Sequence, residues 1–213
     1  MIIVFISGTG SNLNAICNAG LSSSIACVIS NTPHAKGLDI AKKYHIPTYV
    51  VDNKLYTNKA DFERELIAIV DNYTPKYLIL AGFMRILSGD FVNKYHHQII
   101  NIHPSLLPSF TGMHAQKQAF ASRVKIIGIT IHFVTDKLDC GPIILQAVTN
   151  IDRQDTEDDV TIKLLKIEYI VYPFIIRKLL NNMVDIRNDN YVIVKHEKMD
   201  KDILNNQNFY VAY

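Results

Sequence analysis

A chain of 213 residues with 48% hydrophobic and 20% charged residues has the composition of an ordinary folded protein, which argues against extensive disorder and allows one substantial core. The net charge is +2, and the 22 basic and 20 acidic residues are spread along the chain without a basic block, so nucleic acid is not indicated as a partner. Cys17, Cys27 and Cys140 are odd in number and lack metal-ligand spacing, which favours a reducing compartment over a disulfide framework or a zinc site.

The first ten residues, MIIVFISGTG, are expected to form a strand and a turn rather than a targeting segment. They carry no basic region, and five apolar residues before the glycines are too few for a signal peptide or a membrane span. We therefore expect a cytoplasmic protein without membrane association.

The first 82 residues alternate apolar runs with helical patterns. Strands are expected at 2–6, 25–30, 47–51 and 76–81, and helices from residue 12, over 35–44 and over 60–73. Such alternation is typical of parallel strands covered by helices on both faces, with ligands bound at the carboxyl ends of the strands.

After Gly82 the pattern becomes mixed. It indicates a short helix near Ser88, a strand over 98–103, and two strand-like runs, 126–134 and 141–151, that suit an antiparallel pair. A long helix is expected to begin at Thr156, where TEDD resembles a capping box with Asp in place of Glu, and to run to residue 180 through Pro173, which can kink a helix.

The fold class predicted from these elements is α/β. We expect a three-layer α/β/α domain over residues 1–181, with a mostly parallel, Rossmann-like N-terminal half and a mixed C-terminal half of the sheet. A polar tail, 182–213, should follow, with one strand at YVIV.

The stretch FISGTGSNL, residues 5–13, leads from a strand through a glycine turn into a helix. This layout points backbone N–H groups at an anion. The dinucleotide fingerprint is incomplete, because Leu13 stands where a third glycine is needed and the second strand ends in VISN without an acidic residue. A single phosphate held by the amides of Gly10, Ser11 and Asn12 is the preferred interpretation, and a plain tight turn with a serine cap is the alternative.

The stretch INIHPSLLPSF, residues 100–110, places a polar pair at a strand end. Asn101 and His103 share one face of the strand, since side chains alternate, and Pro104 and Pro108 stop the strand because they lack backbone donors. The pair is either a binding or catalytic pair or simply a polar strand end that faces water.

For several other residues the local sequence allows both a functional role and a purely structural one. Thr130 and His132 share a face of the run GITIH, and Asp139 follows a loop rich in turn formers, where a turn aspartate is the alternative. Glu168 lies on the apolar stripe of the long helix, as a salt-bridge partner or a ligand for sugar hydroxyls, and Arg85 is either a surface arginine or a ligand contact.

Six motifs together resemble the folate-dependent formyltransferases over residues 1–180. They are, in chain order, SGTGSNL, AGFMRILS, NIHPSLLPSF, GITIHFV, LDCGPIILQ and EYIVYP. The resemblance implies the formyltransferase fold and the transfer of a formyl group from 10-formyltetrahydrofolate, a co-substrate, to the amine of glycinamide ribonucleotide in purine (IMP) biosynthesis. It implies no metal, small-molecule partners only, and a monomer or weak homodimer.

The resemblance also implies roles for individual residues. Catalysis would fall to Asn101, His103 and Asp139, supported by Thr130 and His132. The phosphate would be held by Gly10, Ser11 and Asn12, and the ribose by Glu168. Folate would be bound by Lys59, Met84, Arg85, Ile86, Leu87, Asn101, Thr135, Asp136, Lys137, Leu138, Asp139 and Cys140. Three positions depart from the family pattern: Cys140 stands where glycine is common, Lys59 where an arginine is often found, and Gln116 where a second histidine can occur.

The chemistry of the implied reaction suits these residues. Attack of an amine on a formyl carbon creates an oxyanion and a positive nitrogen, so the site must donate hydrogen bonds to one atom and accept a proton from another. Asn101 and a protonated His103 are suitable donors, and Asp139 near His103 would favour the imidazolium and accept the proton directly or through a water.

Two other functions remain as alternatives. A formyltetrahydrofolate deformylase would use water in place of the amine, and such relatives carry an extra N-terminal domain, for which this chain has no room before its first strand. A non-catalytic phospho-sugar-binding module would keep the glycine loop but would not need Asn101, His103 and Asp139 together. Both expectations favour the transferase.

Overall fold

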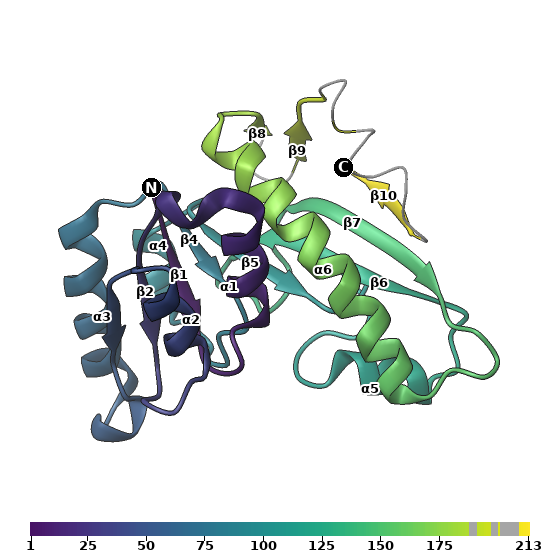
Figure 1. Ribbon diagram of the computed structural model, residues 1–213, viewed down its shortest axis with the longest axis horizontal. Coiled ribbons are helices and arrows are strands. Elements are labelled where there is room, and N and C mark those ends of the chain that lie inside the picture. The colour runs from purple at the N-terminus through teal and green to yellow at the C-terminus, as the bar shows by residue number, and fades with distance from the viewer. Residues whose placement is uncertain (188–190, 197–199, 201–208) are drawn as a thin grey trace. The chain divides into compact units, whose positions relative to one another are not determined.

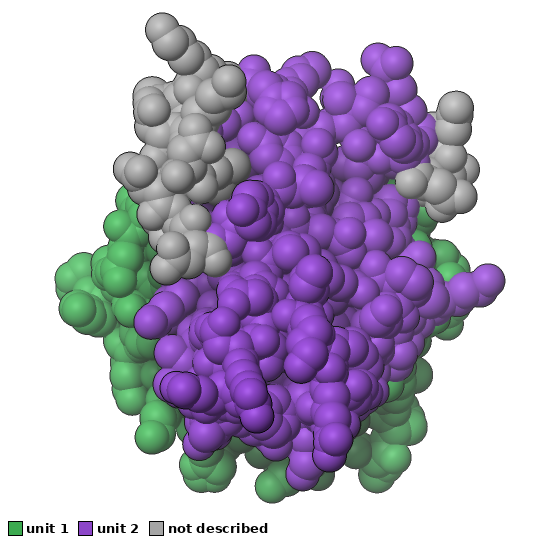
Figure 2. All heavy atoms as spheres, turned by 90° about the vertical axis from the view of Figure 1, so that its right-hand side faces the viewer, with its two compact units in different colours: residues 1–101, 134–136 green, residues 102–133, 137–213 purple. Residues whose placement is uncertain are grey.

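A computed structural model of the chain describes residues 1–187, 191–196, 200 and 209–213. Figure 1 shows its helices and strands. Two compact units, coloured in Figure 2, make up the chain: unit 1 comprises Met1–Asn101 with Val134–Asp136, and unit 2 comprises Ile102–Phe133 with Lys137–Tyr213. The division into a catalytic domain, 1–181, and a tail, 182–213, stays a prediction; the described residues of that tail belong to unit 2.

Unit 1 is built on parallel strands. They are β1 (Ile2–Ile6), β2 (Ile25–Ser30), β3 (Thr48–Val50), β4 (Tyr77–Leu80) and β5 (Ile99–His103, which belongs to unit 1 up to Asn101). They pair in the order β3-β2-β1-β4-β5, so the chain moves outward from β1 first on one side and then on the other. Ligands of α/β sheets bind at the carboxyl ends of the strands where the order reverses in this way.

Helices cover both faces of these strands (Figure 1). They are α1 (Ser11–Ile16) with its π-helical continuation η1 (Cys17–Leu21), the 3-10 turns η2 (Ser22–Ser24) and η3 (Asn53–Leu55), α2 (Gly37–Lys43), α3 (Lys59–Tyr73) and α4 (Gly89–Lys94). On one face, Leu66 of α3 and Phe91 of α4 belong to a buried cluster with Ile3 of β1. On the other face, α2 begins at Gly37, where a Cβ would lie 2.7 Å from the Ile6 side chain.

Unit 2 combines an antiparallel sheet with a long helix. Its elements are α5 (Ala115–Ala121), β6 (Ile126–Phe133), β7 (Ile143–Asn150), α6 (Glu157–Leu180), β8 (Val184–Arg187), β9 (Tyr191–Val194) and β10 (Tyr210–Ala212). β7 pairs antiparallel with both β6 and β10, and β8 and β9 form a separate antiparallel pair. α6 packs against β6, β7 and α5.

The start of α6 is fixed locally. Thr156 accepts a hydrogen bond from the backbone N–H of Asp159, and the Asp159 carboxylate accepts one from the Thr156 N–H, which completes the predicted capping box. The acidic residues of this first turn also complement the positive end of the helix. The helix then continues across Pro173 to Leu180.

The strands and helices predicted in both halves are confirmed within a residue or two at their ends, including the antiparallel pair β6 and β7. The sequence did not predict α5, which is short and begins after His114 in the left-handed conformation without a side-chain cap. In the tail, β9 forms at the predicted YVIV, and β8 and β10 are additional strands. β8 pairs with β9, and β10 pairs with β7.

Two further properties concern membranes and thiols. Among the residues that the structure describes, no helix is long and apolar enough to cross a bilayer. All three cysteines are free, and Cys140 is exposed. Burial raises the pKa of the Cys17 thiol to about 11 and that of Cys27 to about 12, so both thiols stay protonated near neutral pH.

Candidate active site

The polar pair predicted at the end of a strand lies on β5, which ends at His103 as expected. The alternation along the strand holds, because Ile100 is fully buried and Ile102 nearly so, while Asn101 between them is half-buried. His103 is itself only 6% exposed, so it does not face bulk water as a simple polar strand end would.

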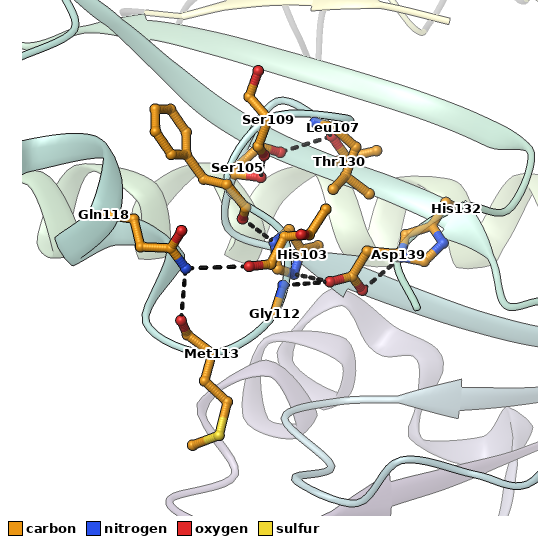
Figure 3. A network of polar contacts seen from close by, with 12 residues as sticks. His103, Ser105, Leu107, Ser109, Gly112, Met113, Gln118, Thr130, His132 and Asp139 are labelled. Carbon is orange, nitrogen blue, oxygen red and sulfur yellow. Dashed lines mark hydrogen bonds and ion pairs between the residues drawn. The ribbon is translucent and has the colours of Figure 1, made fainter. Parts of the chain in front are cut away.

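The His103 ring contacts two groups of unit 2 (Figure 3). Nε2 lies 2.9 Å from the carbonyl oxygen of Phe110, and Nδ1 lies 3.6 Å from Oδ2 of Asp139. A carbonyl can only accept, so Nε2 must carry a proton and Nδ1 is the nitrogen that faces the carboxylate.

Asp139 is held from more than one side. Its side chain is 7% exposed, its Oδ2 accepts a hydrogen bond of 2.7 Å from the Gly112 N–H, and its Oδ1 lies 3.9 Å from Nε2 of His132. The Asp139 backbone has φ of 51°, in the left-handed region that non-glycine residues seldom adopt. The carboxylate therefore has a defined position between two histidines, as Figure 3 shows.

His132 is a neutral neighbour of this pair. It is 2% exposed, and its Nδ1 lies 2.9 Å from the Phe133 carbonyl, which makes Nδ1 the protonated nitrogen. Burial lowers the pKa of His132 below its ordinary value; His103 acts in the same direction, whereas the Phe133 carbonyl and the Asp139 charge partly offset the shift.

This pKa predicts a pH dependence of stability. Because the folded pKa lies below the unfolded value of about 6.5, the unfolded chain binds the proton first, so the free energy of unfolding should fall as pH is lowered through that value towards the folded pKa. Glutamine does not titrate, so His132→Gln lacks this contribution. When urea unfolding is measured at pH 7.5 and at pH 5, the free energy of unfolding should fall less in this variant than in the wild type. The exposed His34→Gln serves as control and should keep the wild-type pH dependence. An unchanged pH dependence in His132→Gln would rule out this origin.

Thr130 organises the turn that follows β5. Its fully buried hydroxyl donates to the Ser105 carbonyl at 2.7 Å and accepts from the Leu107 N–H at 3.0 Å and from the Gln146 amide at 3.0 Å. Gln146 also donates to the Leu107 carbonyl at 3.0 Å. Gly128 leaves room for this turn, because a Cβ there would lie 2.6 Å from the Leu106 side chain. Residues 105–109 are therefore positioned by β6 and β7.

Sequence reasoning missed several of these contributors. Phe110 acts through its backbone carbonyl and Gly112 through its backbone N–H. Every residue type has a carbonyl and nearly every type an N–H, so the residue type at these positions does not indicate the contact. Phe110 and Gly112 both have positive φ, at 54° and 76°. Gln146 lies opposite Thr130 in the β6 and β7 pair. Predicting this contact would have required the register of the two strands, which the sequence leaves open.

The glycine loop, residues 8–12, lies at the carboxyl end of β1. Gly10 has φ of 75° and a Cβ there would lie 2.4 Å from the Gly37 Cα, so only glycine permits this close approach of α2. The Gly37 N–H donates to the Gly8 carbonyl at 3.1 Å. Ser11 begins α1 and Asn12 is buried, as the predicted turn into a helix requires.

Apart from Asn101, the predicted folate residues of unit 1 lie in three segments: Lys59 begins α3, residues 84–87 follow β4, and Thr135 and Asp136 follow β6. Met84, Arg85 and Ile86 are exposed, Met84 to 71% and Ile86 to 69%, whereas Leu87 is buried. Thr135 is half-buried and Asp136 exposed. Two apolar side chains and one arginine of the segment 84–87 are therefore exposed just after the buried strand β4.

Lys59 of α3 is connected to Ser88, which follows the segment 84–87, through Glu63. Its ammonium lies 3.9 Å from Glu63, whose buried carboxylate accepts hydrogen bonds from the backbone N–H of Ser88, at 2.7 Å, and from the Ser88 hydroxyl. Ser88 is in turn the N-cap of α4. Lys59 therefore has a local acidic partner in unit 1.

The remaining candidates belong to unit 2. Lys137 and Cys140 are exposed, and Leu138 is 52% exposed. Glu168 is 6% exposed on α6, and its negative charge adds to burial in raising the pKa of Tyr172. Within unit 2 the structure brings His103, His132 and Asp139 together. Lys137, Leu138 and Cys140 flank Asp139 in the chain, Thr130 lies on β6 with His132, and Glu168 lies on α6.

The comparison with known proteins identifies the family. A family model described as formyl transferase matches residues 1–176. The chain belongs to the formyl transferase family. It is 42% identical, over 82% of its length and 84% of the relative, to the phosphoribosylglycinamide formyltransferase of Escherichia coli (strain K12).

Solved structures of this family confirm the fold class. The crystal structure of phosphoribosylglycinamide formyltransferase from Anaplasma phagocytophilum matches with a TM-score of 0.85 and 41% identity, over 92% of this chain and 95% of that one. A formyltetrahydrofolate deformylase from Pseudomonas syringae matches with a TM-score of 0.83 and 31% identity, over 92% of this chain but 65% of that one. The mostly parallel, mixed α/β fold expected from the sequence is thus that of the formyl transferase family.

Proposed function

We propose that this formyl transferase moves the formyl group of 10-formyltetrahydrofolate to the amine of glycinamide ribonucleotide, a step of purine biosynthesis. The observation that carries the proposal is the His103 and Asp139 pair, buried beside the end of β5. Relatives that carry the name phosphoribosylglycinamide formyltransferase support the choice of acceptor, since their identity to this chain is higher than that of the deformylase.

The proposed reaction begins with attack of the ribonucleotide amine on the formyl carbon. The new carbon–nitrogen bond turns the formyl oxygen into an oxyanion, which the Asn101 amide and the charge of a His103 imidazolium stabilise. The amine proton passes to the Asp139 carboxylate, directly or through a water. The oxyanion then collapses to a carbonyl, the bond between the formyl carbon and the folate nitrogen breaks, and Asp139 returns the proton to that nitrogen as tetrahydrofolate leaves. The Phe110 carbonyl and the Gly112 N–H support these roles because they orient the His103 ring and the carboxylate.

The proposed substrate contacts extend over the other candidates. We assign the phosphate to the amides of Gly10, Ser11 and Asn12, and the ribose to Glu168. Folate contacts are proposed for Lys59, Met84, Arg85, Ile86, Leu87, Thr135, Asp136, Lys137, Leu138 and Cys140, with Thr130 and His132 as support. No step of this scheme uses a metal.

One assay tests the proposed function. The protein is mixed with 10-formyltetrahydrofolate, with and without glycinamide ribonucleotide, and deformylation of the folate is followed by absorbance. Turnover should require the ribonucleotide. Equal turnover in its absence would mean that water is the acceptor and would replace the transferase with a deformylase, which the structural likeness to such an enzyme makes the second candidate.

The setting of this activity is proposed as well. We place the protein in the cytoplasm, as a monomer or weak homodimer that binds small molecules and neither nucleic acid nor membrane. Sedimentation velocity across a range of protein concentrations tests the assembly state, and a stable larger oligomer would contradict it.

A further inference from the structure

Ser7 connects two loops of unit 1. It follows β1 directly, and its backbone N–H donates to the carbonyl of Gly82, at 3.1 Å, just after β4. Its hydroxyl accepts a hydrogen bond of 2.7 Å from the Met84 N–H. One residue thus holds the segment after β4 through both its backbone and its side chain.

The direction of the Ser7 hydroxyl is fixed by two asparagines. Ser7 Oγ donates to Oδ1 of Asn31 at 2.5 Å, and Nδ2 of Asn31 donates to Oδ1 of Asn53 at 2.8 Å. A serine hydroxyl has one hydrogen, so donation to Asn31 leaves its lone pairs for the Met84 N–H. Because Asn31 is 7% exposed, its two hydrogen bonds in the middle of this chain are partly shielded from water, whereas the bond to the Met84 N–H lies at the surface.

The two connected loops are those that the proposed function assigns to the two substrates. Ser7 immediately precedes the glycine loop, residues 8–12, and Met84 opens the segment 84–87. The other end of that segment is also fixed, because the buried Glu63 carboxylate accepts a hydrogen bond of 2.7 Å from the backbone N–H of Ser88. Between these two ties, Met84 and Ile86 are 71% and 69% exposed, and ordering such side chains against a ligand costs conformational entropy.

We propose that Ser7 is a positioning residue that couples binding of the phosphate-bearing substrate to binding of the folate. The inference rests on the proposed function. A phosphate on the glycine loop fixes residues 8–12 and with them Ser7, which then holds the backbone of Met84. The folate meets a segment that is already ordered, so it binds more tightly, and by linkage the folate strengthens ribonucleotide binding by the same factor.

The test measures this factor by calorimetry. The probes are glycinamide ribonucleotide and tetrahydrofolate, which carries no formyl group and therefore cannot react. The Kd of tetrahydrofolate is measured with and without saturating ribonucleotide. In the wild type the ratio of the two values should be about fivefold or more, and in Ser7→Ala it should fall to about one, while each ligand alone binds within about threefold of the wild type.

Two variants separate coupling from general loosening. Ser30→Ala is the matched control, since Ser30 also presents a hydroxyl at the carboxyl end of a strand but bonds to Thr32 rather than to either loop. It should keep the wild-type ratio. Asn31→Ala keeps the Ser7 hydroxyl but removes the acceptor that fixes its direction. This variant should also lower the ratio, and it provides the test if Ser7→Ala fails to fold.

The outcomes are distinct. A wild-type ratio near one, an undiminished ratio in Ser7→Ala, or an equal loss in Ser30→Ala would overturn the inference while leaving the proposed function in place. Failure of the wild type to bind either ligand would overturn the proposed function, and the coupling with it.

Discussion

Asp139→Asn is expected to lower kcat of formyl transfer about a hundred- to a thousandfold. The amide keeps the shape of the carboxylate, and it can still accept from the Gly112 N–H, but it carries no charge to favour the His103 imidazolium and cannot take the amine proton. His103→Ala should cause a loss of similar size, since removing one preorganised stabiliser of an oxyanion typically costs about that factor. Steady-state kinetics with saturating substrates measures both losses.

The same pair predicts how the losses combine. Residues that act as one unit are strongly non-additive, so His103→Ala/Asp139→Asn should be little slower than the poorer single variant. The exposed His34→Ala and Asp158→Asn are matched controls and should stay near the wild-type rate. Circular dichroism establishes that each variant folds. Folded single variants within a few-fold of the wild type would remove His103 and Asp139 from the mechanism.

Asp200→Ala is expected to destabilise unit 2 by about 3–5 kcal/mol, the usual cost of leaving one charge of a buried pair alone. Lys178 of α6 lies 2.8 Å from the Asp200 carboxylate, and the two side chains are 4% and 5% exposed. Lys178 also donates to the Lys195 carbonyl at 3.2 Å and lies over the Phe174 ring, so its ammonium is enclosed by α6 and the tail. Urea unfolding gives the change in free energy.

Two comparisons isolate the buried charge as the cause. Lys178→Met/Asp200→Leu replaces the pair with apolar side chains and should be clearly more stable than Asp200→Ala. Asp185→Ala breaks the exposed pair of Asp185 with Lys195, 3.1 Å apart in the same part of the chain, and should cost less than about 1 kcal/mol. If Asp200→Ala were no worse than Asp185→Ala, the ion pair would not hold the tail.

The tail shows why some strands could not be predicted. β9 has a run of apolar and β-branched residues, YVIV, that favours a strand by itself. β10 has three residues, and it is a strand because it pairs with the edge of β7. The family model matches residues 1–176, so that model does not reach β9 or β10 either.

The sequence by itself determined those features that depend on neighbours along the chain. Pro104 ends β5, the alternation along that strand separates Asn101 and His103 from the isoleucines, and the Thr156 capping box starts α6, because each of these effects acts within a few residues. Only the tertiary structure decided which distant groups meet. The approach of Asp139 to His103, the Phe110 carbonyl at Nε2 and the Ser7 bond to Met84 depend on loop paths and strand order, for which sequence spacing carries no physical constraint.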